Sequence, residues 1–345
     1  MGRRQPLLAT ASNVTLDMVA AACGVSPSTV SRVLSSSARV TPEKEARVRQ
    51  AVAELGFVPN TIARALADGR SFNIGLVAQN FESPFYAQLL RGIDEVLTAA
   101  DYGLFVSSGH WDRHEEERCI HTLRARRVDG IIVLTGLLED SFLAGLAREL
   151  PVVVTGRQLQ APGLHALKTD DAEGARMATR HLLELGHTRI AFIGGDTRHA
   201  DAHERAFGYR AALAEAGLGA DPALAAEGDY LEEGGARAME SLLARGAHFS
   251  AVFAANDQMA AGAASVLHSH GARVPDDVSI VGFDDLQPAA HASPPRTTVN
   301  PHVAELGRRA AHAMLELLAH RHPADRAPAP ELVVLESTRR LASAC

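Results

Sequence analysis

Residues 23–34 read CGVSPSTVSRVL, a stretch that predicts a tight turn followed by a short helix. Gly24 tolerates the left-handed backbone conformation that such a turn requires. Ser26 can cap the helix, and Pro27 suits its first position, where a missing backbone N–H costs nothing. We therefore expect two helices to meet at Gly24.

The helix after the turn has two chemically different faces. Its inward stripe is apolar and is formed by Val30, Val33 and Leu34. Short polar groups allow close approach to DNA, and an arginine can donate two hydrogen bonds to O6 and N7 of a guanine. Groups of this kind occupy the outward face and its flank, at Ser28, Thr29, Ser31 and Arg32. An ordinary surface helix of a three-helix bundle is the alternative.

Flanking segments predict two further helices. Thr15 can cap a helix that starts at Leu16, with Asp17 facing the positive end of its dipole. A third helix opens at Thr41 and runs to about Glu54. Its packing residues are expected to be Ala46, Val48, Val52 and Leu55. Two short helices joined by a glycine turn and braced by a third form a helix-turn-helix.

The charge of the chain divides along its length. The 345 residues carry a net charge of −7, but residues 1–70 hold nine Lys or Arg against five Asp or Glu, a net +4. A small basic module on a larger acidic body supports nucleic-acid binding weakly. No apolar run approaches the roughly 20 residues of a membrane helix, and the first residues lack a secretory signal. Three dispersed cysteines suggest reduced thiols, so we expect a cytoplasmic protein.

Two stretches of the N-terminal region resemble the head of a LacI-family transcriptional regulator. They read TLDMVAAACGVSPSTVSRVL (15–34) and VTPEKEARVRQAVAELGFVPNTIARAL (40–66). The resemblance implies that Pro27, Ser28 and Arg32 address base edges. It also implies that a further set holds mainly phosphates: Thr15, Ser26, Thr29, Ser31 and Arg39.

Residues 59–69 predict a helix of about two turns, which is marginal in water because helix nucleation is costly. Such a helix should form only when something docks against it. The resemblance identifies it as a hinge helix that folds when two copies meet in the minor groove. Asn60, Ala63 and Leu66 would contact DNA there, with Leu66 as a wedge between base steps. A solvated linker is the alternative for the protein off DNA.

From residue 72 onward, short apolar runs alternate with amphipathic stretches. Buried strands that alternate with helices predict parallel sheets covered on both faces. Ligands in such sheets bind beyond the carboxyl ends of the strands. We expect strands at 73–78, 103–108, 130–134, 151–156, 189–195, 250–255 and 277–283.

Polar residues at these strand ends are the candidate ligand contacts. They include Asn80, Arg157, Asn256 and Asp284, and Arg205 is expected to open a helix after the strand that ends at Gly195. No glycine-rich phosphate loop follows any strand, so no nucleotide or other cofactor is expected. Helix capping is an alternative role for Asn256 and Asp284, and a surface ion pair is an alternative for Arg157.

The body also resembles the regulatory domain of the LacI family, which is similar to periplasmic sugar-binding proteins. The matching stretches are TDDAEGARMATRHLLELGHTRIAFIGG (169–195), FAANDQMAAGA (253–263), VPDDVSIVGFDD (274–285) and PPRTTV (294–299). The resemblance implies two doubly wound α/β subdomains linked by three crossovers, with a small molecule between them. It places Arg205, Asn256 and Asp284 in the cleft, with Asn80, Phe85, Tyr86 and Arg157 as its walls.

These expectations define the domain organisation. A flexible N-terminus (1–13) precedes the helix-turn-helix domain (14–58), the hinge helix and linker (59–71) and the effector-binding domain (72–340). The N-subdomain takes about 72–170 and 300–328, and the C-subdomain about 171–299 and 329–340.

The candidate contacts suit a polyol. A carboxylate accepts from neighbouring hydroxyls, an arginine donates in a fork, and an aromatic wall covers the apolar face of a sugar ring. Arg157 and Arg205 together suggest a sugar acid or a phosphate as well as a sugar. His199 and His203 have a spacing that could suit a metal, but no third ligand is evident, so we expect a loop over the cleft.

The sequence therefore predicts a homodimeric repressor that binds near-palindromic operator DNA and responds to a sugar or a sugar-derived metabolite. A solute-binding protein is an alternative, which the DNA-reading head and the missing signal peptide oppose. A sugar hydrolase using Asp284 and Asp285 is another, opposed by the lack of a placed nucleophile or base. We expect no enzymatic activity.

Overall fold

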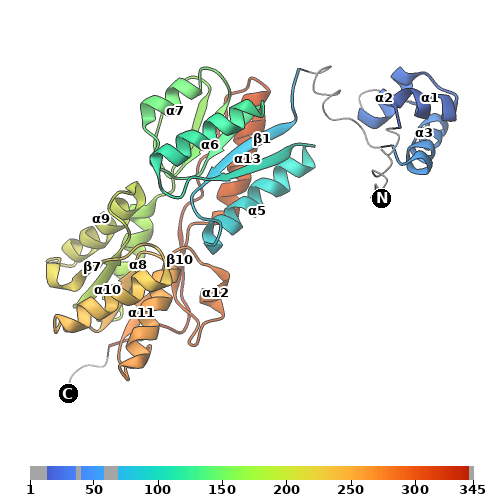
Figure 1. The fold of residues 1–345 in the computed structure, drawn as a ribbon. Helices are drawn as coiled ribbons and strands as arrows, with labels where there is room; N and C mark the ends of the chain where they lie inside the picture. The colour runs from blue at the N-terminus through green and yellow to red at the C-terminus, as the bar shows by residue number, and fades with distance from the viewer. Residues whose placement is uncertain (1–13, 36–39, 58–68, 342–345) are drawn as a thin grey trace, which may run out of the picture. The chain divides into compact units, whose positions relative to one another are not determined.

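The computed structural model describes residues 14–35, 40–57 and 69–341. The chain divides into two compact units, Met1–Ser71 and Phe72–Cys345, and each is described by itself. Figure 1 labels the helices of both units and some strands of the second. Within the described residues, no helix has the length and apolar character needed to cross a membrane.

The described residues of the first unit form three helices: α1 (Leu16–Cys23), α2 (Pro27–Ser35) and α3 (Pro42–Leu55). The predicted N-cap is confirmed, because Oγ1 of Thr15 accepts a hydrogen bond from the backbone N–H of Met18 at 3.3 Å. The predicted turn is confirmed as well, since Gly24 ends α1 in the left-handed conformation with φ 63°. The prediction that Ala46 packs inward is wrong: Ala46 is exposed, and Ala51 takes its place in the core of the head.

The second unit contains two parallel sheets, and we call the parts built around them the N-half and the C-half. The N-half sheet has the strand order β2-β1-β3-β4-β5. Helices α5 and α13 pack against each other on one face, and α6 and α7 cover the opposite face. Its strands are β1 (Asn73–Ala78), β2 (Gly103–Ser108), β3 (Gly130–Val133), β4 (Val152–Thr155) and β5 (Leu164–Leu167). Its helices are α5 (Pro84–Ala99), α6 (Arg113–Ala125), α7 (Asp140–Leu146) and α13 (Val303–Leu318).

The C-half sheet has the order β7-β6-β8-β9. Helix α8 packs with α9, and α10 packs with α11, so that the two pairs enclose the sheet (Figure 1). Its strands are β6 (Ile190–Gly194), β7 (Ala225–Glu227), β8 (Ala251–Ala254) and β9 (Ser279–Val281). Its helices are α8 (Asp171–Glu184), α9 (Ala200–Glu215), η1 (Pro222–Leu224), α10 (Glu232–Ala244), α11 (Asp257–Ser269) and α12 (Gln287–Ala290).

The chain passes between the two halves three times. It leaves the N-half after β5, returns through β10 (Thr298–Asn300) to α13, and leaves again through β11 (Glu331–Val333). Strands β10 and β11 pair with each other in antiparallel fashion. The predicted fold class, a helix-turn-helix head and a body of two parallel-sheet subdomains, is confirmed.

Three expectations about the body are wrong in detail. Strand β2 is not buried: it lies at the sheet edge and exposes Phe105 and Val106. Arg205 does not open its helix, because α9 already begins at Ala200. His203 does not lie in a loop, since it is an exposed residue of the same helix. The sequence also did not predict β5, β7, β10 and β11.

Candidate functional site

The head presents a cluster of hydroxyl groups at the start of α2. Oγ of Ser26 accepts a hydrogen bond from the backbone N–H of Thr29 at 3.2 Å, which fixes the cap. The same oxygen lies 2.8 Å from Oγ of Ser28 and 2.9 Å from Oγ1 of Thr29. Arg32 is exposed in the last turn of this helix. The beginning of α2 and its outer face therefore offer donors and acceptors to a partner.

The other residues predicted to contact DNA fall into two groups. Thr15, Pro27 and Ser31 are exposed, and Thr29 is half-buried. Four more lie outside the described residues: Arg39, Asn60, Ala63 and Leu66.

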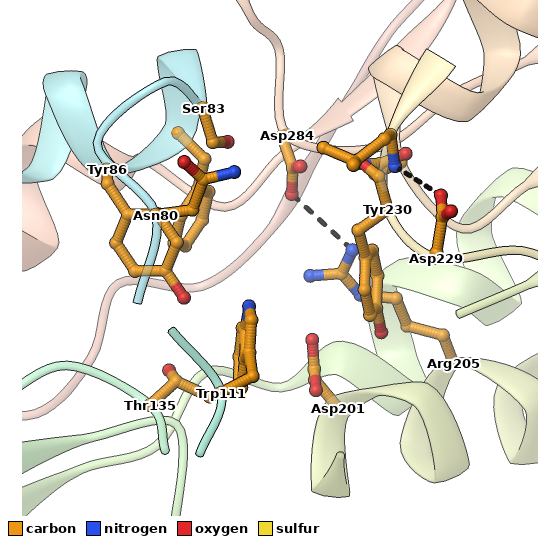
Figure 2. A pocket seen from close by; sticks show the side chains of 13 residues that line it. Asn80, Ser83, Tyr86, Trp111, Thr135, Asp201, Arg205, Asp229, Tyr230 and Asp284 are labelled. Carbon is orange, nitrogen blue, oxygen red and sulfur yellow. Dashed lines mark hydrogen bonds and ion pairs between the residues drawn. The ribbon is translucent and has the colours of Figure 1, made fainter. Parts of the chain in front are cut away.

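The body has a pocket at the carboxyl ends of strands from both sheets, and Figure 2 shows it from close by. About 670 Å³ lies free of protein atoms in it, part of which is open to solvent. Six of the seven residues predicted to contact a ligand line it: Asn80, Phe85, Tyr86, Arg205, Asn256 and Asp284. Seven further lining residues were not predicted as contacts: Ser83, Trp111, Thr135, Asp201, Asp229, Tyr230 and Leu231.

Arg205 is the buried cation of the pocket. Its Nε donates to Oδ1 of Asp171 at 2.8 Å, one Nη1 hydrogen bond goes to the backbone oxygen of Ala255, and Nη1 lies 3.5 Å from Oδ1 of Asp284. The guanidinium also lies over the ring of Phe283, 3.8 Å from its centroid. Burial alone would lower the pKa of Arg205, but the charges of Asp171 and Asp284 raise it. Arg205 therefore stays charged at every physiological pH.

The carboxylates around Arg205 can carry more negative charge than its single positive charge neutralises. Burial raises the pKa of both Asp171 and Asp284, although the charge of Arg205 opposes this effect. Asp201 adds a third carboxylate beside them, and its charge contributes to the raised pKa of Asp284. The base of the pocket is acidic.

Asn256 combines the two roles that the sequence left open. Its side-chain oxygen accepts from the backbone N–H of Met259 at 2.8 Å and caps α11. Its Nδ2 donates to the backbone oxygen of Tyr230 at 2.9 Å while the residue lines the pocket. Asp284 is different, because its residue has φ 103° and it caps no described helix. The next residue in the sequence, Asp285, does not line the pocket, so Asp284 and Asp285 do not form a pair of carboxylates there.

Buried polar atoms without a hydrogen-bond partner gather at this pocket. Among the described residues there are six such side-chain atoms, and five belong to the pocket or to its wall. They are Oδ1 of Asp201, Oδ1 of Asp284, the hydroxyl of Tyr230, and both ring nitrogens of His199. A buried polar group without a partner costs about 1–3 kcal/mol, so such a concentration is typical of a site that receives a polar ligand.

Aromatic rings line the pocket from both halves. Phe85 and Tyr86, at the start of α5, form an edge-to-face pair with centroids 5.3 Å apart. Trp111 follows β2, and Tyr230 follows β7 in the other half. Figure 2 shows both of these rings edge-on, with Asp201 below the space between them. The pocket thus combines apolar walls with an acidic polar base.

Arg157, the seventh predicted contact, does not line the pocket. Its guanidinium donates to the backbone oxygens of Gly136 and Leu138 and lies 3.1 Å from Oδ1 of Asp140. The ion-pair alternative therefore describes its contacts. Arg157 holds the loop after β3, which carries Thr135 of the pocket wall.

Two of the residues that sequence reasoning missed, Trp111 and Tyr230, follow strands at the edges of the two sheets. Tyr230 comes after β7, whose sequence AAE has no strand-like pattern. Trp111 comes after the exposed edge strand β2 and has φ 55°, a conformation that the sequence does not reveal. Polar residues after β2 and β7 could have been found only by treating every strand end as part of the same site. No group of three His, Cys, Asp or Glu in the described part of the chain could hold a metal ion.

Sequence comparisons agree with this two-part architecture. Residues 15–60 match the family described as bacterial regulatory proteins, lacI family. Residues 71–334 match the family described as periplasmic binding proteins and sugar binding domain of LacI family. A DNA-binding head joined to a body with a ligand pocket defines a one-component transcriptional regulator. The chain belongs to the LacI family, as its sequence predicts.

Individual relatives are similar over nearly their whole length. The HTH-type transcriptional regulator GalR of Escherichia coli is 35% identical over 319 residues, which cover 92% of this chain and 91% of GalR. CelR of Thermobifida fusca is 39% identical over 311 residues, covering 88% and 91%.

Two solved structures are also similar. One is the CelR–cellobiose complex, with 36% identity, a TM-score of 0.70, and coverage of 94% of this chain and 99% of that one. The other is the lac repressor dimer bound to operator and the anti-inducer ONPF, with 28% identity, a TM-score of 0.83, and coverage of 95% and 100%.

Proposed function

We propose that this protein is a transcriptional repressor that binds operator DNA through its head and is controlled by a neutral sugar bound in the pocket. The observation that carries the proposal is the group of buried polar atoms without a hydrogen-bond partner on Asp201, Tyr230 and Asp284, of which Asp284 is ion-paired with Arg205. Sugar hydroxyls can donate to the carboxylates and accept from the tyrosine, and aromatic rings can cover the apolar faces of a sugar ring.

The charge of the pocket favours a neutral effector over a sugar acid or a phosphate. Arg205 already faces two carboxylates, and Arg157 is used elsewhere, so no cation is left to neutralise an anionic ligand. Asp201 would repel such a ligand further. Cellobiose, which is bound in the similar CelR structure, is a neutral sugar and belongs in the first set of compounds to be tested.

We further propose the domain boundaries and contacts implied by the family. Residues 14–58 form the DNA-binding domain, 59–71 the hinge helix and linker, and 72–340 the effector domain. The predicted DNA contacts of α2 are supported by the exposure of Ser26, Ser28 and Arg32. Catalysis is not part of the proposed function, because the similar proteins GalR and CelR are transcriptional regulators.

We also propose that the protein acts in the cytoplasm and binds a near-palindromic operator as a homodimer. The similar lac repressor was solved as a dimer on its operator, and the exposed apolar side chains of β2 offer this chain a contact surface. Sedimentation of the wild type and of Phe105→Asp tests this point. A wild-type monomer at micromolar concentration would contradict it.

The effector experiment has two readouts. A thermal-shift screen compares neutral mono- and disaccharides with the corresponding sugar acids and sugar phosphates, and fluorescence anisotropy then follows operator binding with each hit. A ligand at 100 times its Kd adds about 2.7 kcal/mol to the free energy of unfolding, which a melting curve detects. Stabilisation by sugar acids but by no neutral sugar would overturn the proposed effector class.

A further inference from the structure

A histidine ring stacks across the cleft between the two halves. His199 immediately precedes α9 of the C-half and is 5% exposed. Its ring centroid lies 3.7 Å from that of Trp111, which belongs to the N-half, with an interplanar angle of 20°. It lies 5.8 Å from that of Tyr230 in the C-half, with an angle of 9°. The imidazole is therefore parallel to both aromatic walls of the pocket.

Hydrogen bonds do not hold this ring. Both Nδ1 and Nε2 of His199 are buried and have no hydrogen-bond partner. Stacking and burial are what keep the imidazole against Trp111. Because a flat neutral ring can stack in this way without hydrogen bonds, the arrangement suits the uncharged form of the side chain.

The charged groups around His199 do not offset its burial. Asp201 lies on α9, Asp196 and Arg198 precede that helix, and Tyr230 is the titratable group on the other side, while Trp111 does not titrate. Arg198 and Asp196 form their own ion pair at 2.5 Å. Burial lowers the pKa of His199, although Asp201 and Asp196 oppose this effect.

The effect of protonating His199 follows from comparing two energies. A cation over an indole ring gains about 0.5–2 kcal/mol. A buried charge without hydrogen bonds costs several kcal/mol, and the ring lies at the positive end of the α9 dipole. The imidazolium therefore gains more from water than from Trp111, and it reaches water when the two rings separate.

We propose that neutral His199 is a positioning residue of the effector pocket, which keeps Trp111 and Tyr230 in place across the cleft and releases them when it is protonated. Acid then weakens effector binding. This inference rests on the proposed function, because it assigns the stack a role in effector affinity.

The first test uses Trp111, the single tryptophan of the chain, as its own reporter. Its emission in the full-length protein is followed from pH 8 to pH 5. We expect a titration with a midpoint below the ordinary histidine value of about 6.5. His199→Phe keeps a flat ring but cannot titrate, so its emission should stay constant. His203→Phe, an exposed position one turn further along α9, should titrate like the wild type. An unchanged wild-type emission, or a His199→Phe emission that still titrates, overturns the proposal.

The second test measures the Kd of the neutral sugar found in the thermal-shift screen. When the pH falls from 7.5 to 5.5, the wild-type Kd should rise severalfold. The rise is at most about tenfold, because pH 5.5 lies about one unit below the ordinary pKa of an exposed histidine. His199→Phe should bind with a Kd near the wild-type value at both pH values. His199→Ala should bind weakly at both, because it lacks the ring.

Comparison of these variants separates the inference from other acid-sensitive groups in the pocket. Asp171 and Asp284 remain in all of them, so any pH dependence left in His199→Phe belongs to the carboxylates. If His199→Ala binds as tightly as the wild type at pH 7.5, the positioning role is overturned. If no neutral sugar binds at all, the proposed function fails, whereas the emission titration still decides the protonation of His199.

Discussion

Nε of Arg205 lies 2.8 Å from Oδ1 of Asp171, and both side chains are almost completely buried. Asp171 is the first residue of α8, directly after the chain has crossed from the N-half. Arg205 also lines the effector pocket and lies 3.5 Å from Asp284. A ligand that bonds to Arg205 or Asp284 therefore acts on a group that is tied directly to a crossover. Allosteric coupling requires such a shared element, which a ligand can bias.

Arg205→Ala should lower the free energy of unfolding by about 3–5 kcal/mol, because it leaves Asp171 and Asp284 buried without their cation. It should also weaken effector binding at least tenfold, through loss of a charged hydrogen-bond donor. Urea denaturation and calorimetric titration measure the two effects. Arg210→Ala is the matched control, since Arg210 is exposed on the same helix. Equal stability of the two variants would refute the ion-pair cluster.

The sequence predicts the central strands of the body but not the short ones. Runs such as GIIV in β3 and AVFA in β8 are fully buried and consist of apolar residues, which gives an unambiguous signal. The strands LHAL (β5) and AAE (β7) are partly exposed at sheet edges, so their composition resembles that of loops. Their strand conformation depends on a neighbouring strand that is distant in sequence.

The pocket was predictable where a polar side chain directly follows a buried strand, as at Asn256 and Asp284. It was not predictable where tertiary contacts decide the outcome. Arg157 follows β4 just as Asn256 follows β8, but the carbonyl groups of a neighbouring loop bind its guanidinium. The His199–Trp111 stack joins residues from two halves, and only their docking brings the rings together.

Arg32→Ala should weaken operator binding by about 1–3 kcal/mol and relax sequence preference at one base pair of each half-site, because an arginine that reads a guanine is lost. The affinity for an operator obtained by in vitro selection is measured by anisotropy at fixed salt. Arg49→Ala serves as the control, since Arg49 is exposed on α3 and pairs with Glu45. An equal loss on all DNA sequences would indicate that Arg32 contacts phosphate instead.

The contribution of Asp257 to the stability of the body should fall as the pH rises through the acidic and neutral range. Burial raises the pKa of Asp257 from 3.8 to about 7. The folded state therefore holds this proton more tightly than the unfolded state, so the stabilisation is complete below pH 3.8 and is lost progressively up to about pH 7. Asp257 accepts hydrogen bonds from the backbone N–H of Leu286 and from the hydroxyl of Thr298. An asparagine can keep both contacts, because its side-chain oxygen accepts from Leu286 and its side-chain nitrogen donates to the Thr298 hydroxyl.

Asp257→Asn should accordingly raise Tm at pH 8 and change it little at pH 5. The contribution of Asp257 to the unfolding free energy should differ between these two pH values by about 2.7 kcal/mol, because pH 5 lies about two units below the folded pKa and each unit is worth about 1.36 kcal/mol. Calorimetry at both pH values measures it. A wild-type Tm that rises from pH 5 to pH 8 in parallel with that of the variant would show that Asp257 is ionised in the folded state even at the lower pH.

Gly92→Ala should destabilise the N-half. A Cβ at Gly92 would lie 2.0 Å from the backbone oxygen of Ala304, because α5 and α13 approach each other closely at this point. The helices must then move apart, at a cost of about 1–3 kcal/mol. Gly145→Ala in α7 is the control, because a Cβ there meets nothing within 4 Å and alanine favours the helix by up to about 1 kcal/mol. Denaturant midpoints should therefore shift in opposite directions for the two variants. A Gly92→Ala protein as stable as the wild type would mean that the contact between α5 and α13 can widen without loss of packing.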